Sequence, residues 1–328
     1  MADLLLYQSQ RRSWKNSLAD KKKIIVICGP TASGKTGLSL LLAQQYNGEI
    51  ISADSMQVYK ELDIGTAKAT KEEQAVAPHH LVDILDPQQP YNVQQFVEMA
   101  RKAIDDITSR GKLPIIVGGT GLYIESLING IKFSDQPDNN AIKEQLQQEL
   151  TECGKEHMYN ILQEIDPEYA STVHKNNTVR VLRAIEIYRL TGHNMTWQLK
   201  HSKPLEKPYD ALLLGLNFED RAKLYDNINL RVDIMMAQGV LKEAEYVFEN
   251  KESFKTCVSA IGYKEFFPYF EKEKSLEECV DKLKQASRNY AKRQLTWFNR
   301  MKEINWLFID KEDYKTKARI ITERFLGN

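Results

Sequence analysis

The chain has 328 residues, enough for one large or two ordinary domains, and its 45 lysines and arginines balance its 45 aspartates and glutamates, so net charge alone gives no case for nucleic-acid binding. The four cysteines include no Cys-x-x-Cys pair, which excludes a zinc site or disulfide framework of that kind and favours a reducing cytosol. No signal peptide and no apolar stretch of about 20 residues can be read, so we expect a cytoplasmic protein without a membrane span. We also expect a monomer.

The first apolar run, 24–28, predicts a buried strand, and the residues directly after it follow the phosphate-binding pattern Gly-x-x-x-x-Gly-Lys-Thr. A helix from 35 to about 46 is expected next. In this context glycines let backbone N–H groups curl around an anion, Lys35 supplies a positive charge, and the Thr36 hydroxyl can ligate magnesium. The residues predicted to bind a di- or triphosphate are Gly29, Pro30, Thr31, Ala32, Ser33, Gly34, Lys35 and Thr36.

Further short apolar runs alternate with helical stretches along the chain. Several are apolar throughout, which is typical of parallel strands covered on both faces. A helix is expected at 90–111, and strands are expected at 49–53, 80–85, 114–117, 211–216 and 305–309. The pattern predicts an α/β fold with a P-loop nucleotide-kinase-like core built on a parallel sheet.

The alternation stops in one long segment, which carries helical patterning only and begins and ends with polar or proline-containing residues. We therefore predict an all-helical insertion domain within the core. The expected organisation is a loose N-terminal extension at 1–22, the first part of the catalytic core at 23–133, the helical insertion at 134–205 and the C-terminal part of the core at 206–328.

Asp54 follows the second predicted strand, at the edge of the sheet where ligands collect in open α/β folds. Its carboxylate could face the phosphate loop and either ligate magnesium or accept a proton; capping of the next helix is the alternative. The glycines of 63–68 and 117–123 could allow the backbone to approach a ligand, or could simply permit tight turns.

Two stretches are rich in positive charge. Residues 282–302 contain seven basic and no acidic side chains, and residues 174–207 contain seven basic and two acidic ones. Helical spacing places Arg180 and Arg183 on one face, and Lys284, Arg288 and Lys292 on another. Such faces could grip a polyanion or could be merely solvated. Arg221 and Arg231 flank a helix after the 211–216 strand, and either could reach back to the phosphate loop.

Taken together, these segments resemble the bacterial tRNA dimethylallyltransferases. The segments 29–36, 52–55 with 63–68, 78–83, 117–123, 177–183, 261–263 and 291–297 follow in that family's order. The resemblance implies transfer of a dimethylallyl group from dimethylallyl diphosphate to the exocyclic N6 amine of the adenosine at tRNA position 37, next to the anticodon, in tRNAs that read codons starting with U, with release of diphosphate. The implied partners are the tRNA anticodon stem-loop and dimethylallyl diphosphate, and the implied cofactor is Mg²⁺.

The resemblance also implies roles for particular residues. Lys35, Arg221 and a magnesium ion held by Thr36 and Asp54 would neutralise the leaving diphosphate. Asp54 would accept the proton of the amine as the C–N bond forms. The Thr31 hydroxyl would donate to the bridging oxygen. The implied catalytic residues are thus Asp54, Thr31, Lys35 and Arg221.

The target adenine must leave the anticodon-loop stack to reach Asp54. Ser259 departs from the basic residue associated with its segment, so its assignment as a phosphate contact is weaker than the others. From the resemblance and the charge pattern, the residues expected to bind tRNA are Asp54, Ser55, Met56, Gln57, Thr120, Lys143, Val179, Arg180, Val181, Leu182, Arg183, Ser259, Ala260, Ile261, Gly262, Tyr263, Lys264, Lys284, Arg288 and Lys292.

Two other functions remain open from the sequence. An ATP-dependent small-molecule kinase would share the phosphate loop, the strand-end aspartate and a lid-like insertion. Against it, the chain has no convincing arginine-rich lid, and a kinase would have no use for the two basic stretches. A non-catalytic RNA-binding protein would have no need of the complete Lys35–Thr36 pair.

Overall fold

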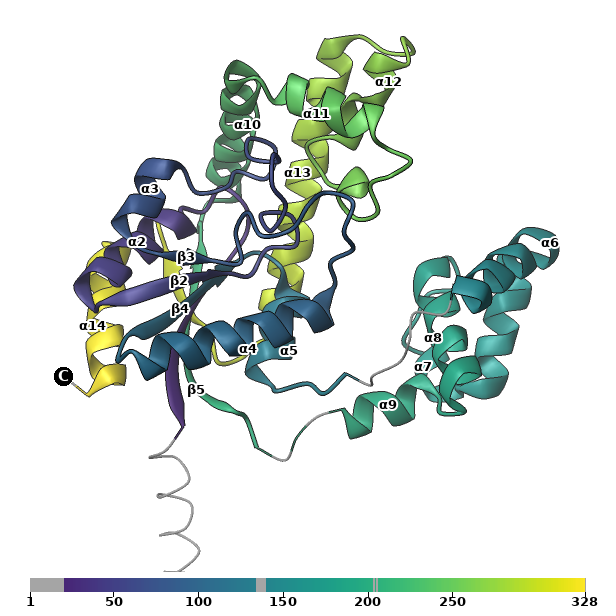
Figure 1. Ribbon diagram of the computed structural model, residues 1–328, viewed down its shortest axis with the longest axis horizontal. Coiled ribbons are helices and arrows are strands. Elements are labelled where there is room, and N and C mark those ends of the chain that lie inside the picture. Colours follow the sequence, from purple (N-terminus) through teal and green to yellow (C-terminus); the bar gives the residue numbers. More distant parts are fainter. Residues whose placement is uncertain (1–20, 134–139, 203, 205, 328) are drawn as a thin grey trace, which may run out of the picture. The chain divides into compact units, whose positions relative to one another are not determined.

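The computed structural model describes residues 21–133, 140–202, 204 and 206–327 (Figure 1). The chain divides into two compact units, one formed by 1–128 with 208–328 and the other by 129–207. The second unit contains the range expected for the helical insertion. Most of the expected N-terminal extension, and the polar segment 134–139, lie outside the described residues. Among the described residues, no helix is both long enough and apolar enough to span a bilayer.

A parallel sheet of six strands forms the centre of the first unit, in the order β3-β2-β4-β1-β5-β6. Its strands are β1 (Lys22–Cys28), β2 (Gly48–Ser52), β3 (His79–His80), β4 (Leu113–Gly118), β5 (Tyr209–Asn217) and β6 (Asn305–Phe308). Because β1 pairs with both β4 and β5, the phosphate loop that follows β1 lies at the middle of the sheet. The predicted parallel α/β fold is confirmed.

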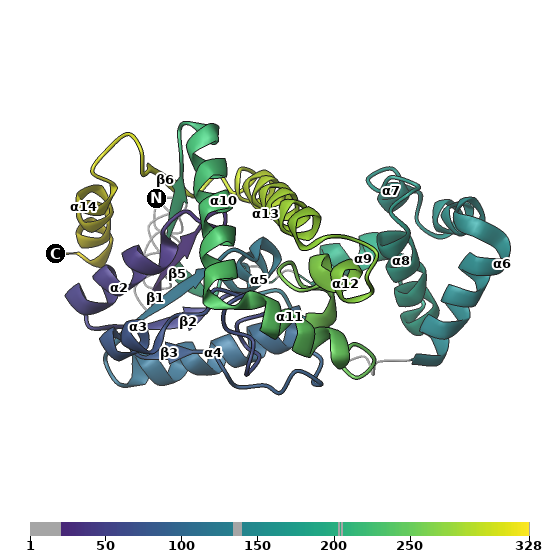
Figure 2. The ribbon, with the colours of Figure 1, turned by 90° about the horizontal axis from the view of Figure 1, so that it is seen from above.

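Helices cover both faces of the sheet (Figure 2). On one face, α2 (Lys35–Gln45) and α14 (Tyr314–Leu326) share a core with the β1 residues Ile25 and Ile27. The alternating β1 residues Ile24 and Val26 point to the other face, where α4 (Val93–Ser109) and α5 (Gly121–Ile128) pack. All four β1 side chains are fully buried, which explains why the strand is apolar throughout.

The helices that follow β5 bring distant sequence to the phosphate loop. They are α10 (Arg221–Gln238), α11 (Val240–Glu249), the 3₁₀ turns Cys257–Ser259 and Lys264–Phe266, α12 (Phe267–Phe270) and α13 (Leu276–Phe298). α13 passes the carboxyl ends of β1 and β4. There the buried Gln294 side chain accepts from the Thr31 backbone N–H and donates to the Gly119 carbonyl, at 2.8 and 3.0 Å.

All of the described regular structure in the second unit is helical: α6 (Asn140–Ile165), α7 (Pro167–Ala170), α8 (Thr178–Thr191) and α9 (Met195–His201). α6 is interrupted at Gly154, whose φ of 79° lies outside the helical region. The core of this unit is formed by Leu146, Met158, Leu162, Ala170, Val173, Val181, Ala184 and Ile185. Asp166 is buried, and its carboxylate accepts hydrogen bonds from Thr196 and from the Tyr169 backbone.

The strand expected at 80–85 is wrong beyond its first residue. β3 covers only His79–His80, and the chain then adopts positive φ angles at Leu81 (60°) and Asp83 (56°), which a strand does not allow. The Asp83 carboxylate instead pairs with the buried ammonium of Lys68, which also pairs with Asp63. A tertiary ion pair therefore bends a segment that local sequence reads as extended. The helix α3 (Lys71–Val76) lies between these two regions of the chain.

Candidate active site

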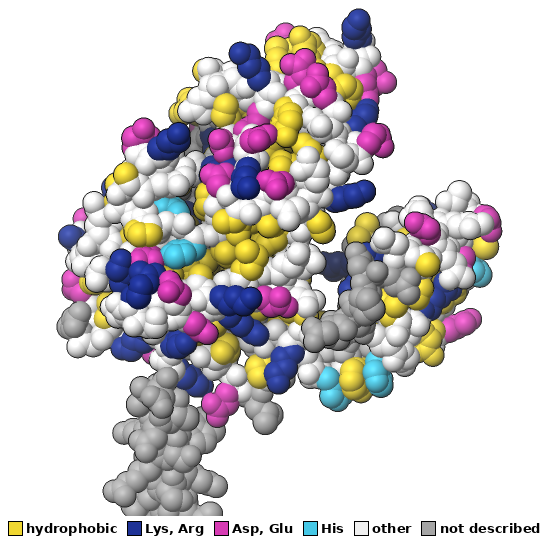
Figure 3. All heavy atoms as spheres, viewed as in Figure 1, with side chains coloured by type: hydrophobic (Ala, Val, Ile, Leu, Met, Phe, Trp, Pro, Cys, Tyr) yellow, Lys and Arg dark blue, Asp and Glu magenta, His cyan; other side chains and the backbone are white. Residues whose placement is uncertain are grey.

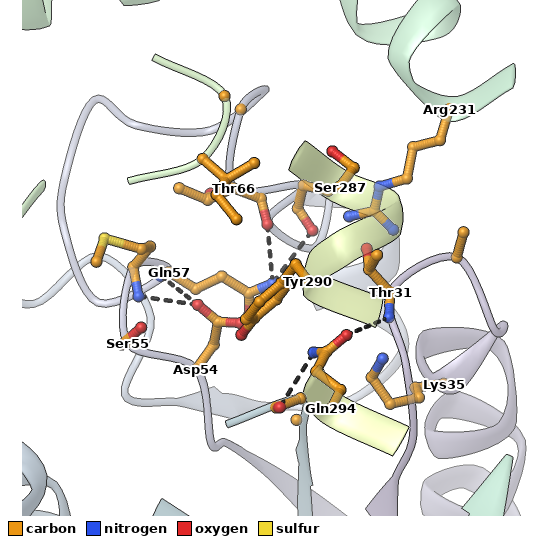
Figure 4. Close-up of a pocket in the computed structure, with 18 of the residues that line it drawn as sticks. Thr31, Lys35, Asp54, Ser55, Gln57, Thr66, Arg231, Ser287, Tyr290 and Gln294 are labelled. Carbon is orange, nitrogen blue, oxygen red and sulfur yellow. Dashed lines mark hydrogen bonds between the residues drawn. The ribbon is translucent and has the colours of Figure 1, made fainter. Parts of the chain in front are cut away.

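A cavity of about 400 Å³ lies at the carboxyl ends of β1, β2 and β4 (Figure 4). The phosphate loop and the β2 end form part of its wall. The rest comes from the loop around Thr66, α10, the segment near Ile261 and α13, and every lining residue belongs to the first unit. Ligands bind at this edge of open α/β sheets, so the cavity is the candidate active site.

The phosphate loop has the backbone shape that its glycines predict. Gly29 has a φ of 144°, and a Cβ placed on it would lie 2.3 Å from the Leu216 carbonyl oxygen. Gly34 precedes α2 in the left-handed conformation, with a φ of 76°. The buried Ser33 hydroxyl donates to the Pro30 carbonyl at 2.8 Å and stabilises the turn. Residues 31–36 line the cavity, whereas Gly29 and Pro30 support them from behind.

Two cations of the cavity are poorly compensated. The Lys35 ammonium donates to the carbonyls of Gly29 and Pro30 at 3.1 and 2.7 Å, and Arg231 forms no ion pair within the described part of the chain. Burial, and after it the Arg231 charge, lower the pKa of Lys35 to about 8, although the Asp54 charge opposes both effects. Burial likewise lowers the pKa of Arg231. An anion bound here would relieve the cost of holding both charges.

Asp54 follows β2 and lies across the cavity from these cations (Figure 4). Its Oδ1 accepts from the backbone N–H groups of Met56 and Gln57, at 2.8 and 3.4 Å. These bonds fix the carboxylate through one oxygen and leave Oδ2 for a ligand. Tyr290 of α13 is beside it: burial and the Asp54 charge raise the pKa of this phenol to about 12, so it is a neutral hydrogen-bond donor near neutral pH.

Two glutamines tie the loops of the cavity together. Gln57 donates to the carbonyls of Thr66 and Ala67, at 3.3 and 3.2 Å, and accepts from the Ser52 hydroxyl at 2.8 Å. Gln294 links the phosphate loop to the end of β4, as described above. Because each side chain bonds to groups from two segments, the cavity wall is held without a ligand.

The structure places Arg231, and not Arg221, at the cavity, which corrects the expectation for the second cation. Both lie on α10, but Arg221 is in its exposed first turn, whereas Arg231 shares a face with the lining residues Ile228, Val232 and Met235. Ten residues of helix separate the two arginines by about 15 Å along the axis. The sequence places both on one helix and cannot say which end reaches the site.

Two of the three cations of the basic face expected on α13 have partners within the protein. Lys284 forms a salt bridge with Asp233 of α10 at 2.6 Å, and Arg288 donates to Asn229 of the same helix at 2.6 Å. Only Lys292 of this trio is exposed. On the face of the first unit shown in Figure 3, basic and acidic side chains are interspersed, without a large patch of one sign.

The remaining predicted tRNA contacts divide into three groups, with Thr120 apart from them. Those that line the cavity are Ser55, Met56, Gln57, Ser259, Ala260, Ile261, Gly262 and Lys264. Those exposed on the second unit are Lys143, Val179, Arg180 and Arg183. Two are corrected because they pack inside the protein: Val181 belongs to the core of the second unit, and Tyr263 is fully buried, whereas Leu182 is partly buried against that core. Thr120 follows β4 but is not a lining residue.

Sequence reasoning missed the polar face that α13 turns toward the cavity. Leu283, Ser287, Tyr290 and Gln294 all line it, together with Arg293. The spacing of the first four, i, i+4, i+7 and i+11, marks one helical face. The signal available in the sequence was the helical spacing that places polar side chains on the same face as the buried Leu283.

Comparison with known proteins agrees with this geometry. Residues 57–301 match the family model described as IPP transferase, and residues 22–80 match isopentenyl transferase. A tRNA dimethylallyltransferase of Bacillus cereus (strain AH187) is 51% identical over 286 residues, which cover 87% of this chain and 90% of that protein. A Bacillus anthracis protein of the same name is equally similar, with 51% identity over 87% of this chain and 90% of its own.

Solved structures give the same result. A tRNA isopentenylpyrophosphate transferase from Staphylococcus epidermidis is 42% identical, with a TM-score of 0.68, over 94% of this chain and 99% of that one. A eukaryotic dimethylallyltransferase acting on tRNA is 33% identical, with a TM-score of 0.79, over 94% of this chain and 80% of that one. The matches extend over both units and over the whole cavity. The chain is therefore a transferase and belongs to the IPP transferase family, the tRNA dimethylallyltransferases.

Proposed function

We propose that this protein prenylates tRNA by transferring a dimethylallyl group from dimethylallyl diphosphate to the N6 amine of adenosine 37, in tRNAs that read codons starting with U. One observation carries the proposal: a phosphate loop with two undercompensated cations and a carboxylate with an available oxygen line the same cavity. The names of the relatives support tRNA as acceptor and the dimethylallyl group as the transferred unit.

The cationic end of the cavity suits the donor. An allylic C–O bond breaks readily when the leaving diphosphate is stabilised, and Lys35, Arg231 and the backbone N–H groups of the phosphate loop supply that stabilisation. The Thr31 hydroxyl is on the lining part of this loop, where it can donate to the bridging oxygen. Arg231 takes the role that the sequence suggested for Arg221.

The other end suits the acceptor. The adenine N6 lone pair is delocalised, so the amine becomes acidic only as its new bond to carbon forms. In the proposed step the C–O bond of the donor breaks, the N–C bond forms, the diphosphate leaves, and Asp54 accepts the amine proton through Oδ2. Its Oδ1 bonds to Met56 and Gln57 keep the carboxylate in place during the transfer.

Magnesium is part of the proposal, and the residues at the cavity fit it. Mg²⁺ takes hard oxygen ligands and is commonly held by one or two protein oxygens together with substrate phosphates. The Thr36 hydroxyl and the Asp54 carboxylate both line the cavity. No group of three or more His, Cys, Asp or Glu side chains in the described chain could hold a metal by itself. When bound, the ion would neutralise charge on the diphosphate.

The decisive experiment incubates the protein with labelled dimethylallyl diphosphate and synthetic anticodon stem-loops. One stem-loop has adenosines at positions 36 and 37, a second has guanosine at 37, and a third has guanosine at 36. Nuclease digestion and mass spectrometry then detect N6-dimethylallyladenosine. We expect product with the first, none with the second and less with the third. Consumption of ATP without modified RNA would instead support the kinase.

A further inference from the structure

A partly buried contact next to the cavity involves the carboxylate of Glu243 on α11. This carboxylate accepts hydrogen bonds from three successive backbone N–H groups, those of Asp63, Ile64 (3.1 Å) and Gly65 (2.7 Å). The phenol of Tyr263 donates to it as well, at 3.1 Å. Neither Glu243 nor Tyr263 lines the cavity. An anion held by consecutive amides and a hydroxyl is a strong, charge-assisted anchor.

Packing around Tyr263 makes this contact close. The ring is fully buried and lies directly against Gly65, because a Cβ placed on Gly65 would be 2.5 Å from Tyr263 Cε1. Gly262 approaches the same loop: it has a φ of 112°, and its Cβ would lie 3.2 Å from the Gly65 carbonyl oxygen. These two glycines therefore permit the close approach, which a larger residue would prevent.

The anchored loop is the one that Gln57 holds from the cavity side. Gly65, Thr66 and Ala67 line the cavity, and the Gln57 side chain donates to the carbonyls of Thr66 and Ala67 (Figure 4). The backbone N–H of Gln57 donates to Asp54. A continuous set of hydrogen bonds therefore leads from Glu243 through the 63–67 loop to Gln57 and to the proposed proton acceptor.

We infer that Glu243 and Tyr263 are positioning residues for the acceptor adenine: by fixing the 63–67 loop they hold Gln57 beside Asp54 and so set where the amine lies. The inference rests on the proposed function and deepens it. The described contacts of Lys35 and Arg231 do not include this network. Binding of dimethylallyl diphosphate at the cationic end of the cavity should therefore not depend on it. The expected signature is a loss of turnover with diphosphate binding retained.

The test compares Glu243→Gln and Tyr263→Phe with Glu245→Gln, the same change at an exposed position on the same helix. In Glu243→Gln the new side-chain NH₂ group is a hydrogen-bond donor, and it faces backbone N–H groups and a hydroxyl that also donate. The substitution therefore disrupts the anchor. We expect kcat for transfer to the stem-loop to fall about 10- to 100-fold, in line with a misplaced reacting group, while the Kd for dimethylallyl diphosphate changes less than about twofold. Glu245→Gln should match the unsubstituted protein.

Tyr263→Phe keeps the ring and removes only the phenolic hydroxyl that donates to Glu243. This variant therefore still tests the inference if Glu243→Gln does not fold. It should lower kcat less than Glu243→Gln, and have no added effect in the double variant, because the phenol acts through the carboxylate. Normal turnover in both single variants, or a parallel loss of donor affinity, would overturn the inference. If the unsubstituted protein and Glu245→Gln also gave no prenylated RNA, the proposed function itself would fail.

Discussion

The cations of the cavity and those of the α13 face differ in what compensates their charge. Lys35 donates only to backbone carbonyls, and Arg231 has no ion pair within the described residues. Lys284 pairs with Asp233, and Arg288 donates to Asn229, so both are engaged by the neighbouring helix α10. The two cavity cations therefore lack a compensating anion in the part of the chain that the structure describes, whereas Lys284 of the α13 face already has one in Asp233.

The comparison shows that the number of basic residues in a stretch is a poor guide to anion binding. The stretch 282–302 is the most basic part of the chain, yet two of its three aligned cations stabilise helix packing. The two cavity cations come from segments that are nearly 200 residues apart. What distinguishes them is burial without a carboxylate partner, which lowers the pKa of each. The following substitutions test this distinction.

Asp54→Asn should have the largest effect. The amide keeps the size of the side chain but cannot accept the amine proton, so we expect kcat to fall about 10²- to 10⁴-fold. Single-turnover transfer to the stem-loop measures the loss. Binding of dimethylallyl diphosphate should persist because Lys35 and Arg231 remain. The thermal protection that the bound donor gives the protein measures this binding. Near-normal turnover would remove Asp54 from the proposed mechanism.

Lys35→Ala should come next, with a loss of about 10²- to 10³-fold in kcat/KM, the cost of removing one preorganised group at a developing charge. The protein should stay folded, since its lysine bonds only to carbonyls of its own loop. Circular dichroism checks the fold, and labelled donor measures the rate. Full activity would mean that the loop does not hold the diphosphate.

Arg231→Ala and Arg221→Ala form a matched pair on α10. Loss of a charge-assisted contact costs about 1.5–3 kcal/mol, so donor affinity should fall about 10- to 100-fold for Arg231→Ala. Arg221→Ala should leave it unchanged, because that side chain is outside the cavity. Calorimetric titration with dimethylallyl diphosphate gives both values. A reversed order would restore Arg221 as the diphosphate ligand.

A smaller effect is expected from pH. The pKa of Lys35 is lowered to about 8 in the ligand-free protein, so donor affinity should weaken by up to about tenfold per unit above pH 8 as the ammonium loses its proton. Between pH 8 and about 10.4 the unfolded chain binds this proton and the folded one does not, so the Lys35 contribution to stability rises with pH in that window. Lys35→Met should abolish both dependences, which titrations at several pH values would show.

The smallest effects are expected on the salt dependence of RNA binding, in which Lys292 and Lys284 should differ. If exposed Lys292 contacts an RNA phosphate, Lys292→Ala should reduce the slope of log affinity against log salt by about 0.7–0.9. Lys284→Ala should leave this slope nearly unchanged, since its charge is already paired with Asp233. Filter binding of the stem-loop at several salt concentrations measures both. Equal changes in the two variants would contradict the distinction drawn here.

The phosphate loop, the parallel sheet and the family could be predicted from the sequence because each depends on local signals. Glycines at 29 and 34 permit the positive φ angles of the loop, and short apolar runs such as 24–28 and 114–117 are typical of strands buried on both faces. Asp54 could be assigned to the site because residues that follow neighbouring parallel strands meet at one edge. These inferences need no knowledge of how distant segments pack.

Only the tertiary structure decided which cations face the cavity and which side chains support it. Arg231 lines the cavity and Arg221 does not, because of the way α10 packs. Lys284 pairs with Asp233 of α10, about 50 residues earlier in the chain. Glu243 is close to no motif in the sequence, yet it holds the 63–65 backbone. The reason is physical: a local pattern fixes the backbone of a segment, but the partner of a charged side chain depends on contacts between segments that the pattern does not encode.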